Sequence, residues 1–199
     1  MRAVYRDGRC LVYASHRLLR IVETVLHGVH VVDEVFVRHL VVMVNESRIV
    51  ETCDGLLWNM RTREKYQLVS FSADGGDSWS DGEACHLPPA KNCDVGVVSV
   101  QGKEDYENMV LMSRVSQTDL RRDMEIRISY DGGKSFPDSF SLMKGDAMPG
   151  YSDMCVIEED EPVIGLLHCR NNHVLFSRIS LQTLTGGRYD NTSRSVWLK

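Results

Sequence analysis

The side chains of this sequence that could act together in chemistry are one glutamate, one tyrosine and two arginines near the ends of strand-like runs. They are Glu46, Tyr151, Arg61 and Arg121. Arginine holds a carboxylate through bidentate, charge-assisted hydrogen bonds. A tyrosine hydroxyl has a reference pKa of about 10, so it becomes nucleophilic at neutral pH only when a base such as glutamate takes its proton. If the fold brings these four residues together, they could hold a carboxylate beside an activated phenol.

Each of these residues also has a plainer explanation. Most arginines are solvated, and Arg61 and Arg121 could simply stand at strand ends. Glu46 could be a turn residue, with Glu51 as a competing acid a few residues later. Tyr151 could be an interior tyrosine whose hydroxyl is satisfied by a neighbour. The functional interpretation therefore depends on whether the four side chains converge.

A short turn pattern occurs twice and indicates the elements that would position these residues. The two copies are Ser72–Trp79 (SADGGDSW) and Ser129–Phe136 (SYDGGKSF), and each follows a strand-like run. Glycine supplies positive φ, and Asp and Ser bond neighbouring backbone amides, so each copy predicts a hairpin turn. The two copies begin 57 positions apart, which is about the length of one propeller blade. Two copies at this interval predict a radial repeat of small antiparallel sheets.

The side chains of the two turns have expected structural roles. Asp74 and Asp131 should accept hydrogen bonds from backbone amides within their own loops. Trp79 and Phe136 should pack locally, each against its own sheet. Both loops are expected on the outer rim of the repeat, away from the chemistry.

From about residue 45 onward, runs rich in Val, Ile, Leu and Tyr alternate with turns of Gly, Asp, Asn and Pro, which is typical of an all-β chain. A hairpin loop is expected at Arg170–His173, with His168 and His173 on the surface. The expected strands are Arg48–Thr52, Leu56–Arg61, Tyr66–Phe71, Val95–Gln101, Met109–Ser113, Met124–Ser129, Met154–Ile157, Ile164–Cys169 and Val174–Leu181.

The sequence resembles the sialidase family, whose members are six-bladed β-propellers, over roughly residues 45 to 184. The two turns are similar to the Asp-box of that family. Other segments match it in order and spacing: Asn45-Glu46-Ser47 with Val50–Gly55 and Asn59-Met60-Arg61, Arg121–Ser129, Gly150-Tyr151-Ser152-Asp153, and Ile164–Leu167 with Phe176–Leu181. The resemblance implies an all-β fold built from propeller blades.

The resemblance also implies a role for each candidate residue. Tyr151 corresponds to the nucleophile and Glu46 to the carboxylate that activates it. Arg61 and Arg121 correspond to the second and third arginines of a cluster that binds the carboxylate of sialic acid. Arg121 is selected over Arg122 by its distance from the second Asp-box. A neutral tyrosine avoids the repulsion that a carboxylate nucleophile would suffer, and sialidases are an exception to the two-carboxylate rule of glycoside hydrolysis.

The implied function is that of an exo-α-sialidase, a glycoside hydrolase that releases terminal sialic acid from glycoproteins, gangliosides or oligosaccharides. The implied partners are sialylated glycans, with no cofactor and no metal. The alternative is a propeller that binds sialoglycans or serves as an interaction scaffold without cleaving them. These classes differ in whether the site residues converge and whether an acid is present.

Two parts of the family site have no match in this sequence, namely the first arginine and the general-acid aspartate. The chain is therefore expected to hold a partial propeller of about three to four blades. Residues 1–44 are expected to be an atypical N-terminal segment, 45–185 the propeller blades, and 186–199 a polar tail. Within the first segment, Leu18–Leu40 has both a helical period and the β-branched content of a strand, and both interpretations stay open.

Composition excludes several classes of protein. The formal net charge of −5 argues against a nucleic-acid partner, because phosphate binding needs a basic face. No apolar run approaches the ~18 residues of a transmembrane helix, and no signal peptide is visible, so the compartment stays open. The six cysteines lack metal-like spacing and are expected mostly as reduced thiols, with a Cys85–Cys93 disulfide as a minor alternative.

Overall fold

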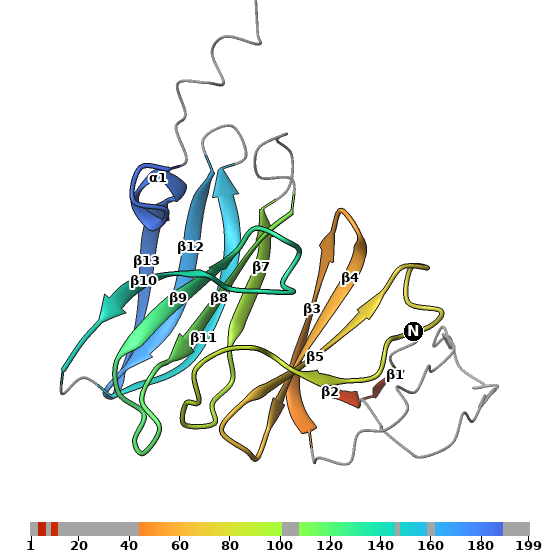
Figure 1. Ribbon diagram of the computed structural model, residues 1–199. Helices are drawn as coiled ribbons and strands as arrows, with labels where there is room; N and C mark the ends of the chain where they lie inside the picture. Colours follow the sequence, from red (N-terminus) through yellow and green to blue (C-terminus); the bar gives the residue numbers. More distant parts are fainter. Residues whose placement is uncertain are drawn as a thin grey trace, which may run out of the picture.

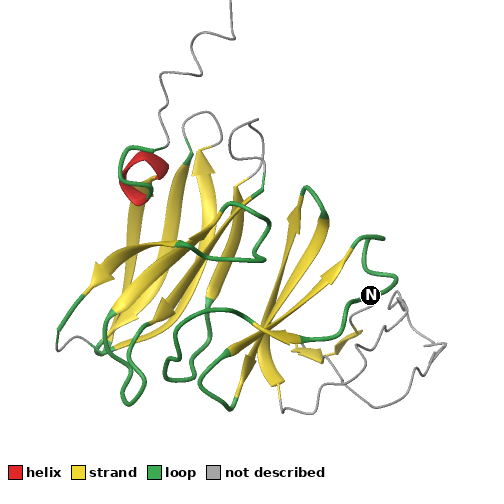
Figure 2. Ribbon diagram, in the orientation of Figure 1, coloured by secondary structure: helices red, strands yellow, loops and turns green. Residues whose placement is uncertain are grey.

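The computed structural model describes residues 4–6, 9–11, 44–100, 108–145, 148–158 and 162–188, and this part of the chain is almost entirely β-structure (Figure 2). The strands are β1 Val4–Arg6, β2 Arg9–Leu11, β3 Val44–Thr52, β4 Gly55–Thr62, β5 Gln67–Ser72, β6 Glu83–Ala84, β7 Gly96–Val100, β8 Met109–Val115, β9 Met124–Ser129, β10 Asp138–Met143, β11 Pro149–Glu158, β12 Val163–Arg170 and β13 His173–Ser180. A single short helix, α1 (Leu181–Leu184), follows β13 within the described residues.

The strands form antiparallel sheets in which each strand pairs with the next one in sequence. The sheets are β1-β2, β3-β4-β5-β6, β7-β8-β9-β10 and β11-β12-β13. We call the last three sheets 1, 2 and 3. Figure 1 shows them side by side in sequence order, and β7, the first strand of sheet 2, contacts both β3 and β11. The first strands of the three sheets therefore lie together.

The core lies between adjacent sheets. Leu57 and Val69 of sheet 1 pack with Val110 and Met112 of sheet 2. On the other face of sheet 2, residues of β8 and β9 pack with sheet 3 around Ile164. Both faces of β8 are thus covered, and this explains why its seven residues are all buried and why it opens with four consecutive apolar residues, Met109–Met112.

The two Asp-box turns have the predicted internal hydrogen bonds. The Ser78 amide donates to Asp74 Oδ1 at 2.9 Å, and the Gly76 amide donates to the Ser72 hydroxyl at 2.9 Å. In the second turn the Ser135 amide donates to Asp131 Oδ1 at 2.8 Å. Each aspartate carboxylate therefore bonds a backbone amide of its own loop, as expected from the sequence.

The aromatic residues that close the two turns pack differently. Trp79 packs edge-on against Trp58 of its own sheet, with ring centroids 5.3 Å apart, as predicted. Phe136 is buried in a cluster that holds Val110 and Met112 of its own sheet and also Leu57 of sheet 1, so its packing extends beyond the local contact that was expected. Gly133 explains the approach of this turn, because a Cβ there would lie 2.4 Å from Leu57 Cδ2. The second Asp-box thus belongs to the joint between two sheets.

The structure corrects several details of the predicted elements. The expected strands are present, but β1, β2, β6 and β10 are not among those expected, and β11 begins at Pro149, so that Tyr151 lies inside a strand. His168 is buried and its Nε2 lies 3.0 Å from the Ser177 hydroxyl, so its surface placement is wrong. Cys85 and Cys93 are free thiols, which removes the disulfide alternative.

Some predictions fall outside the described residues. The segment Leu18–Leu40 and nearly all of the expected polar tail lie there. In the part of the chain that the structure describes, no helix is long and apolar enough to cross a membrane.

Candidate functional site

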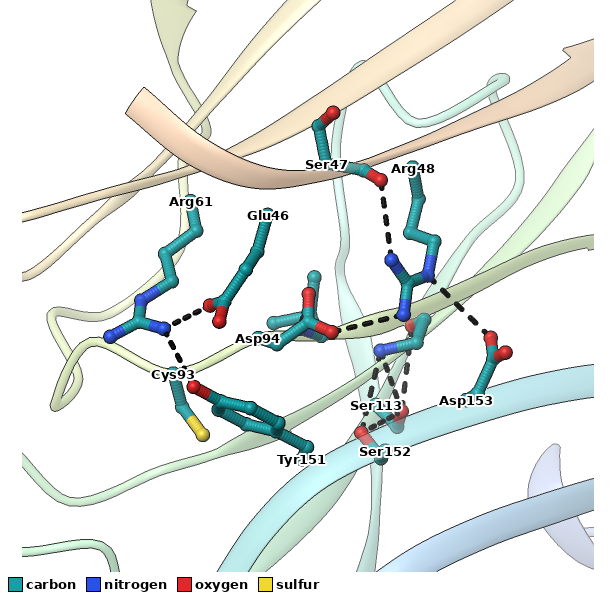
Figure 3. A network of polar contacts seen from close by, with 12 residues as sticks. Glu46, Ser47, Arg48, Arg61, Cys93, Asp94, Ser113, Tyr151, Ser152 and Asp153 are labelled. Atoms are coloured by element: carbon teal, nitrogen blue, oxygen red, sulfur yellow. Dashed lines mark hydrogen bonds and ion pairs between the residues drawn. The ribbon is translucent and has the colours of Figure 1, made fainter. Parts of the chain in front are cut away.

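The first strands of the three sheets bring the predicted site residues together. Glu46 lies near the start of β3 and Tyr151 near the start of β11, while Asp94 lies just before β7 (Figure 3). Because β7 contacts both other first strands, these residues lie on one side of the molecule. Register places the first Asp-box at the other end of sheet 1, since Ser72 pairs with Leu56 whereas Arg61 pairs with Gln67.

Glu46 occupies a β-bulge. Asn45 pairs with Arg61 and Ser47 pairs with Met60, so Glu46 is the extra residue between two regular pairs. Its φ is +25°, which is uncommon for a residue with a side chain. A bulge of this kind redirects a side chain locally. Figure 3 shows the result, with the Glu46 carboxylate turned toward Arg61.

Arg61 links the glutamate to the tyrosine. It lies at the end of β4, and its Nη1 donates to a carboxylate oxygen of Glu46 and, at 3.3 Å, to the Tyr151 hydroxyl. One guanidinium nitrogen of Arg61 thus contacts both the Glu46 carboxylate and the Tyr151 hydroxyl. The predicted pairing of these three side chains is therefore present, although Glu46 and Tyr151 are far apart in sequence.

Arg121 completes the group from the loop between β8 and β9. Its guanidinium carbon lies 5.5 Å from the centroid of the Tyr151 ring, and that of Arg61 lies 6.0 Å away. Both distances are within the range of a cation–π contact. Tyr151 nevertheless remains 45% exposed, whereas the Arg61 side chain is only 13% exposed. All four predicted residues converge.

The electrostatics of the group favour an ionised glutamate. Burial alone would raise the pKa of the Glu46 carboxyl, but hydrogen bonds from Arg61 and Tyr151, together with the positive charges of Arg61 and Arg121, hold it below its ordinary value. The carboxylate is therefore charged at neutral pH and able to accept a proton.

A second polar network, which sequence reasoning missed, adjoins the first. Arg48 of β3 donates from Nη2 to Asp94 at 2.9 Å, and its Nε lies 3.6 Å from Asp153 Oδ1. Burial raises the pKa of Asp94, and the charges of Glu46 and Asp153 add to this effect against that of Arg48. The sequence gives little indication of this network. Arg48 is recognisable only as an arginine of an expected strand, two positions after Glu46, and its partners Asp94 and Asp153 are distant in sequence.

The strand of Tyr151 is anchored by its next residue. Ser152 is buried, and its hydroxyl lies 2.7 Å from that of Ser113 on β8 and accepts from the Gly96 amide at 3.3 Å. Gly96 makes this close approach possible, because a Cβ there would lie 2.9 Å from Asp153 Cα. β11 therefore packs directly against sheet 2 beside the site.

The competing acid and the neighbouring arginine lie elsewhere. Glu51 pairs with Leu56 at the far end of β3, and Arg122 is exposed while Arg121 faces Tyr151. Over the described ranges, no group of three or more His, Cys, Asp or Glu residues is arranged to hold a metal ion.

Comparison with known proteins identifies the repeat. The sequence matches the family described as BNR repeat-like domain over residues 30–169. A search of curated proteins finds no significant match.

Solved structures with similar folds include several sialidases. The Hadza microbial sialidase Hz136 is 27% identical, with a TM-score of 0.59 over 71% of this chain and 28% of its own. The NanB sialidase of Streptococcus pneumoniae is 16% identical, with a TM-score of 0.65 over 92% of this chain and 30% of its own. The intramolecular trans-sialidase of Ruminococcus gnavus is 21% identical, with a TM-score of 0.58 over 69% of this chain and 33% of its own.

These similarities confirm the predicted fold class. The three sheets correspond to part of a sialidase-type β-propeller. In this chain each Asp-box turn joins the last two strands of its sheet, β5 to β6 and β9 to β10. The chain spans a third or less of the length of the structures that it matches.

Proposed function

Because this chain belongs to the family of BNR repeat-like domains and its sheets have the sialidase fold, we propose that it acts as an exo-α-sialidase that releases terminal sialic acid from sialylated glycans. One observation supports the proposal above all. Arg61 bonds to both Glu46 and Tyr151, while Arg121 faces the same tyrosine ring. This is the constellation that a carboxylate-bearing sugar requires.

The proposed mechanism assigns each residue one task. Arg61 and Arg121 bind the carboxylate of sialic acid by charge-assisted hydrogen bonds. The Tyr151 oxygen attacks the anomeric carbon while its proton passes to Glu46, and the glycosidic oxygen leaves with the bonding electron pair and takes a proton from solvent. Water then attacks the anomeric carbon and breaks the sugar–tyrosine bond. Glu46 returns its proton to the Tyr151 oxygen, and the proton lost by the water passes to solvent. An aspartate nucleophile would be repelled by the substrate carboxylate, whereas the phenol is not.

The alternative is that the chain binds sialoglycans without cleaving them. Among the described residues, the two further carboxylates beside the site are those of Asp94 and Asp153, and both contact Arg48. Neither is therefore an obvious donor of a proton to the leaving group. The arginines would suffice for binding in either case.

A comparison of two substrates tests the proposal. We expect the chain to hydrolyse an aryl sialoside about 10²–10⁴-fold better than a sialyl-lactose-type substrate, because an aryl leaving group needs little protonation. Tyr151→Phe should abolish hydrolysis of the aryl sialoside. Tyr130→Phe is the matched control, since it removes a hydroxyl that bonds Asp138 away from the site.

The outcomes separate the two functions. Hydrolysis that persists in Tyr151→Phe would contradict the assigned nucleophile. Binding of sialic acid without turnover of either substrate would favour the non-catalytic alternative, and neither binding nor turnover would contradict both.

A further inference from the structure

We propose that Arg48 is a positioning residue that braces the Glu46 bulge against the strand carrying Tyr151, an inference that assigns a new residue to the proposed sialidase site and rests on that function. Arg48 touches neither Glu46 nor Tyr151 in any hydrogen bond of Figure 3. It acts through their neighbours in the chain.

The contacts of Arg48 reach all three sheets. Its Nη1 donates to the Ser47 carbonyl at 3.3 Å, on the residue that closes the bulge. Its Nη2 donates to Asp94 at the entrance to β7, and its Nε lies 3.6 Å from Asp153 on β11. One guanidinium thus joins the three first strands that carry the site.

The bulge needs such a brace because its geometry is unfavourable. Glu46 has positive φ without being glycine, and such a conformation persists only where the surrounding structure holds it. The Ser47 carbonyl belongs to the next peptide along the chain, so holding it limits rotation of the backbone directly after the bulge. A free bulge would let the Glu46 carboxylate leave the Tyr151 hydroxyl.

The contact of Arg48 with Asp153 helps to hold the strand that carries Tyr151. Tyr151 and Asp153 are two residues apart on β11, so their side chains leave the strand on the same face. Both Tyr151 and Asp153 are more than a third exposed, whereas Ser152 between them is buried. Arg48 therefore ties the exposed face of β11 to β3, while Ser152 ties the buried face to sheet 2.

Arginine suits this role better than lysine. Arg48 uses three nitrogens in three directions, and a planar guanidinium presents them in a fixed fork. Asp94 has a side chain that is only 9% exposed, so its charge needs this partner. A lysine would keep the charge but could not hold all three groups in one geometry.

The test compares Arg48→Met and Arg48→Lys with Lys134→Met. Lys134 also joins two sheets, through a 2.6 Å ion pair with Asp54, but at the end away from the site. Amide hydrogen exchange in the full chain should speed up at least about tenfold over residues 44–48 and 150–154 in both Arg48 variants. Exchange over β8 should stay unchanged, and Lys134→Met should leave both site segments as in the wild type.

Hydrolysis of an aryl sialoside gives the second readout. Loss of positioning should lower kcat by about 10²-fold in Arg48→Met while KM changes less than about threefold, because the binding arginines remain. Arg48→Lys should recover only a small part of kcat. A purely stabilising role would lower the amount of folded protein without this division between kcat and KM.

The outcomes are distinguishable from failure of the proposed function. Unchanged exchange at both site segments in Arg48→Met would overturn the inference, as would full rescue by lysine. If Arg48→Met does not fold, the same measurements on Arg48→Lys decide the question. Faster exchange at the site segments in a chain that neither binds nor cleaves sialosides would support the brace and refute the sialidase assignment.

Discussion

At the scale of single residues, Arg121 and Arg122 form a natural pair for separating ligand binding from ordinary surface charge. Arg121 faces the Tyr151 ring, whereas its neighbour is exposed. Arg121→Gln removes one charge-assisted contact to the substrate carboxylate, which is worth about 1.5–3 kcal/mol. The dissociation constant for sialic acid, measured by calorimetry, should therefore rise about 10–150-fold.

Arg122→Gln is the control for that measurement, and we expect it to change the dissociation constant less than about threefold. Equal weakening in both variants would mean that binding depends on the net charge of the loop. The choice between these two arginines could be made from sequence because the resemblance to the sialidase family implies a fixed distance between this arginine and the Asp-box serine. Arg48 could not be found in this way, since Asp94 lies 46 positions away, just before β7, and Asp153 lies still farther along the chain, on β11.

At the scale of elements, the second Asp-box turn is a stabilising unit whose contribution can be measured. Asp131 accepts from the Ser135 amide and from the hydroxyls of Ser129 and Ser135. Asp131→Ala should lower the free energy of unfolding by about 1–2 kcal/mol, as the loss of a local cap does. Urea denaturation followed by circular dichroism measures this change.

Asp77→Ala serves as the comparison, because it removes an exposed aspartate from the corresponding loop of sheet 1. It should change the free energy of unfolding by less than about 0.5 kcal/mol. An Asp131→Ala protein that is as stable as the wild type but no longer binds sialic acid would assign the loop to the site, contrary to its position at the far end of the sheet.

Local chemistry explains which elements were predictable. The turns follow from Gly, Asp and Ser alone, and β8 from its apolar run. β10 was missed because half of its sequence, DSFSLM, consists of Asp and Ser, residues that are typical of turns. The burial of His168 follows from register, which pairs it with Ser152 on one side and Leu175 on the other. Strand pairing across such distances has no local signal in the sequence.

At the scale of the whole molecule, the two faces of sheet 3 differ sharply. Ile164 and Leu166 are buried against sheet 2. On the opposite face, Leu167 pairs with Phe176, and Ile157 and Phe176 approach each other over Gly165. These three apolar side chains are 40–59% exposed. We call Ile157, Leu167 and Phe176 the outer patch of sheet 3. Its residues are large and apolar, like those that form the core between sheets 1 and 2 and between sheets 2 and 3.

An apolar patch of this kind should make the chain self-associate, because a contiguous exposed surface gains free energy when another surface removes it from water. β13 adds to this tendency, since among the described residues it pairs only with β12 and so presents a strand edge. Sedimentation velocity at about 0.1 mM should therefore show dimers or larger species.

The double variant Leu167→Ser with Phe176→Ser should sediment mainly as a monomer. Leu120→Ser, which removes a side chain of similar exposure (48%) outside the patch, should associate as the wild type does. A wild-type chain that stays monomeric, or a double variant that associates equally, would mean that this face is too small or too divided to drive contact.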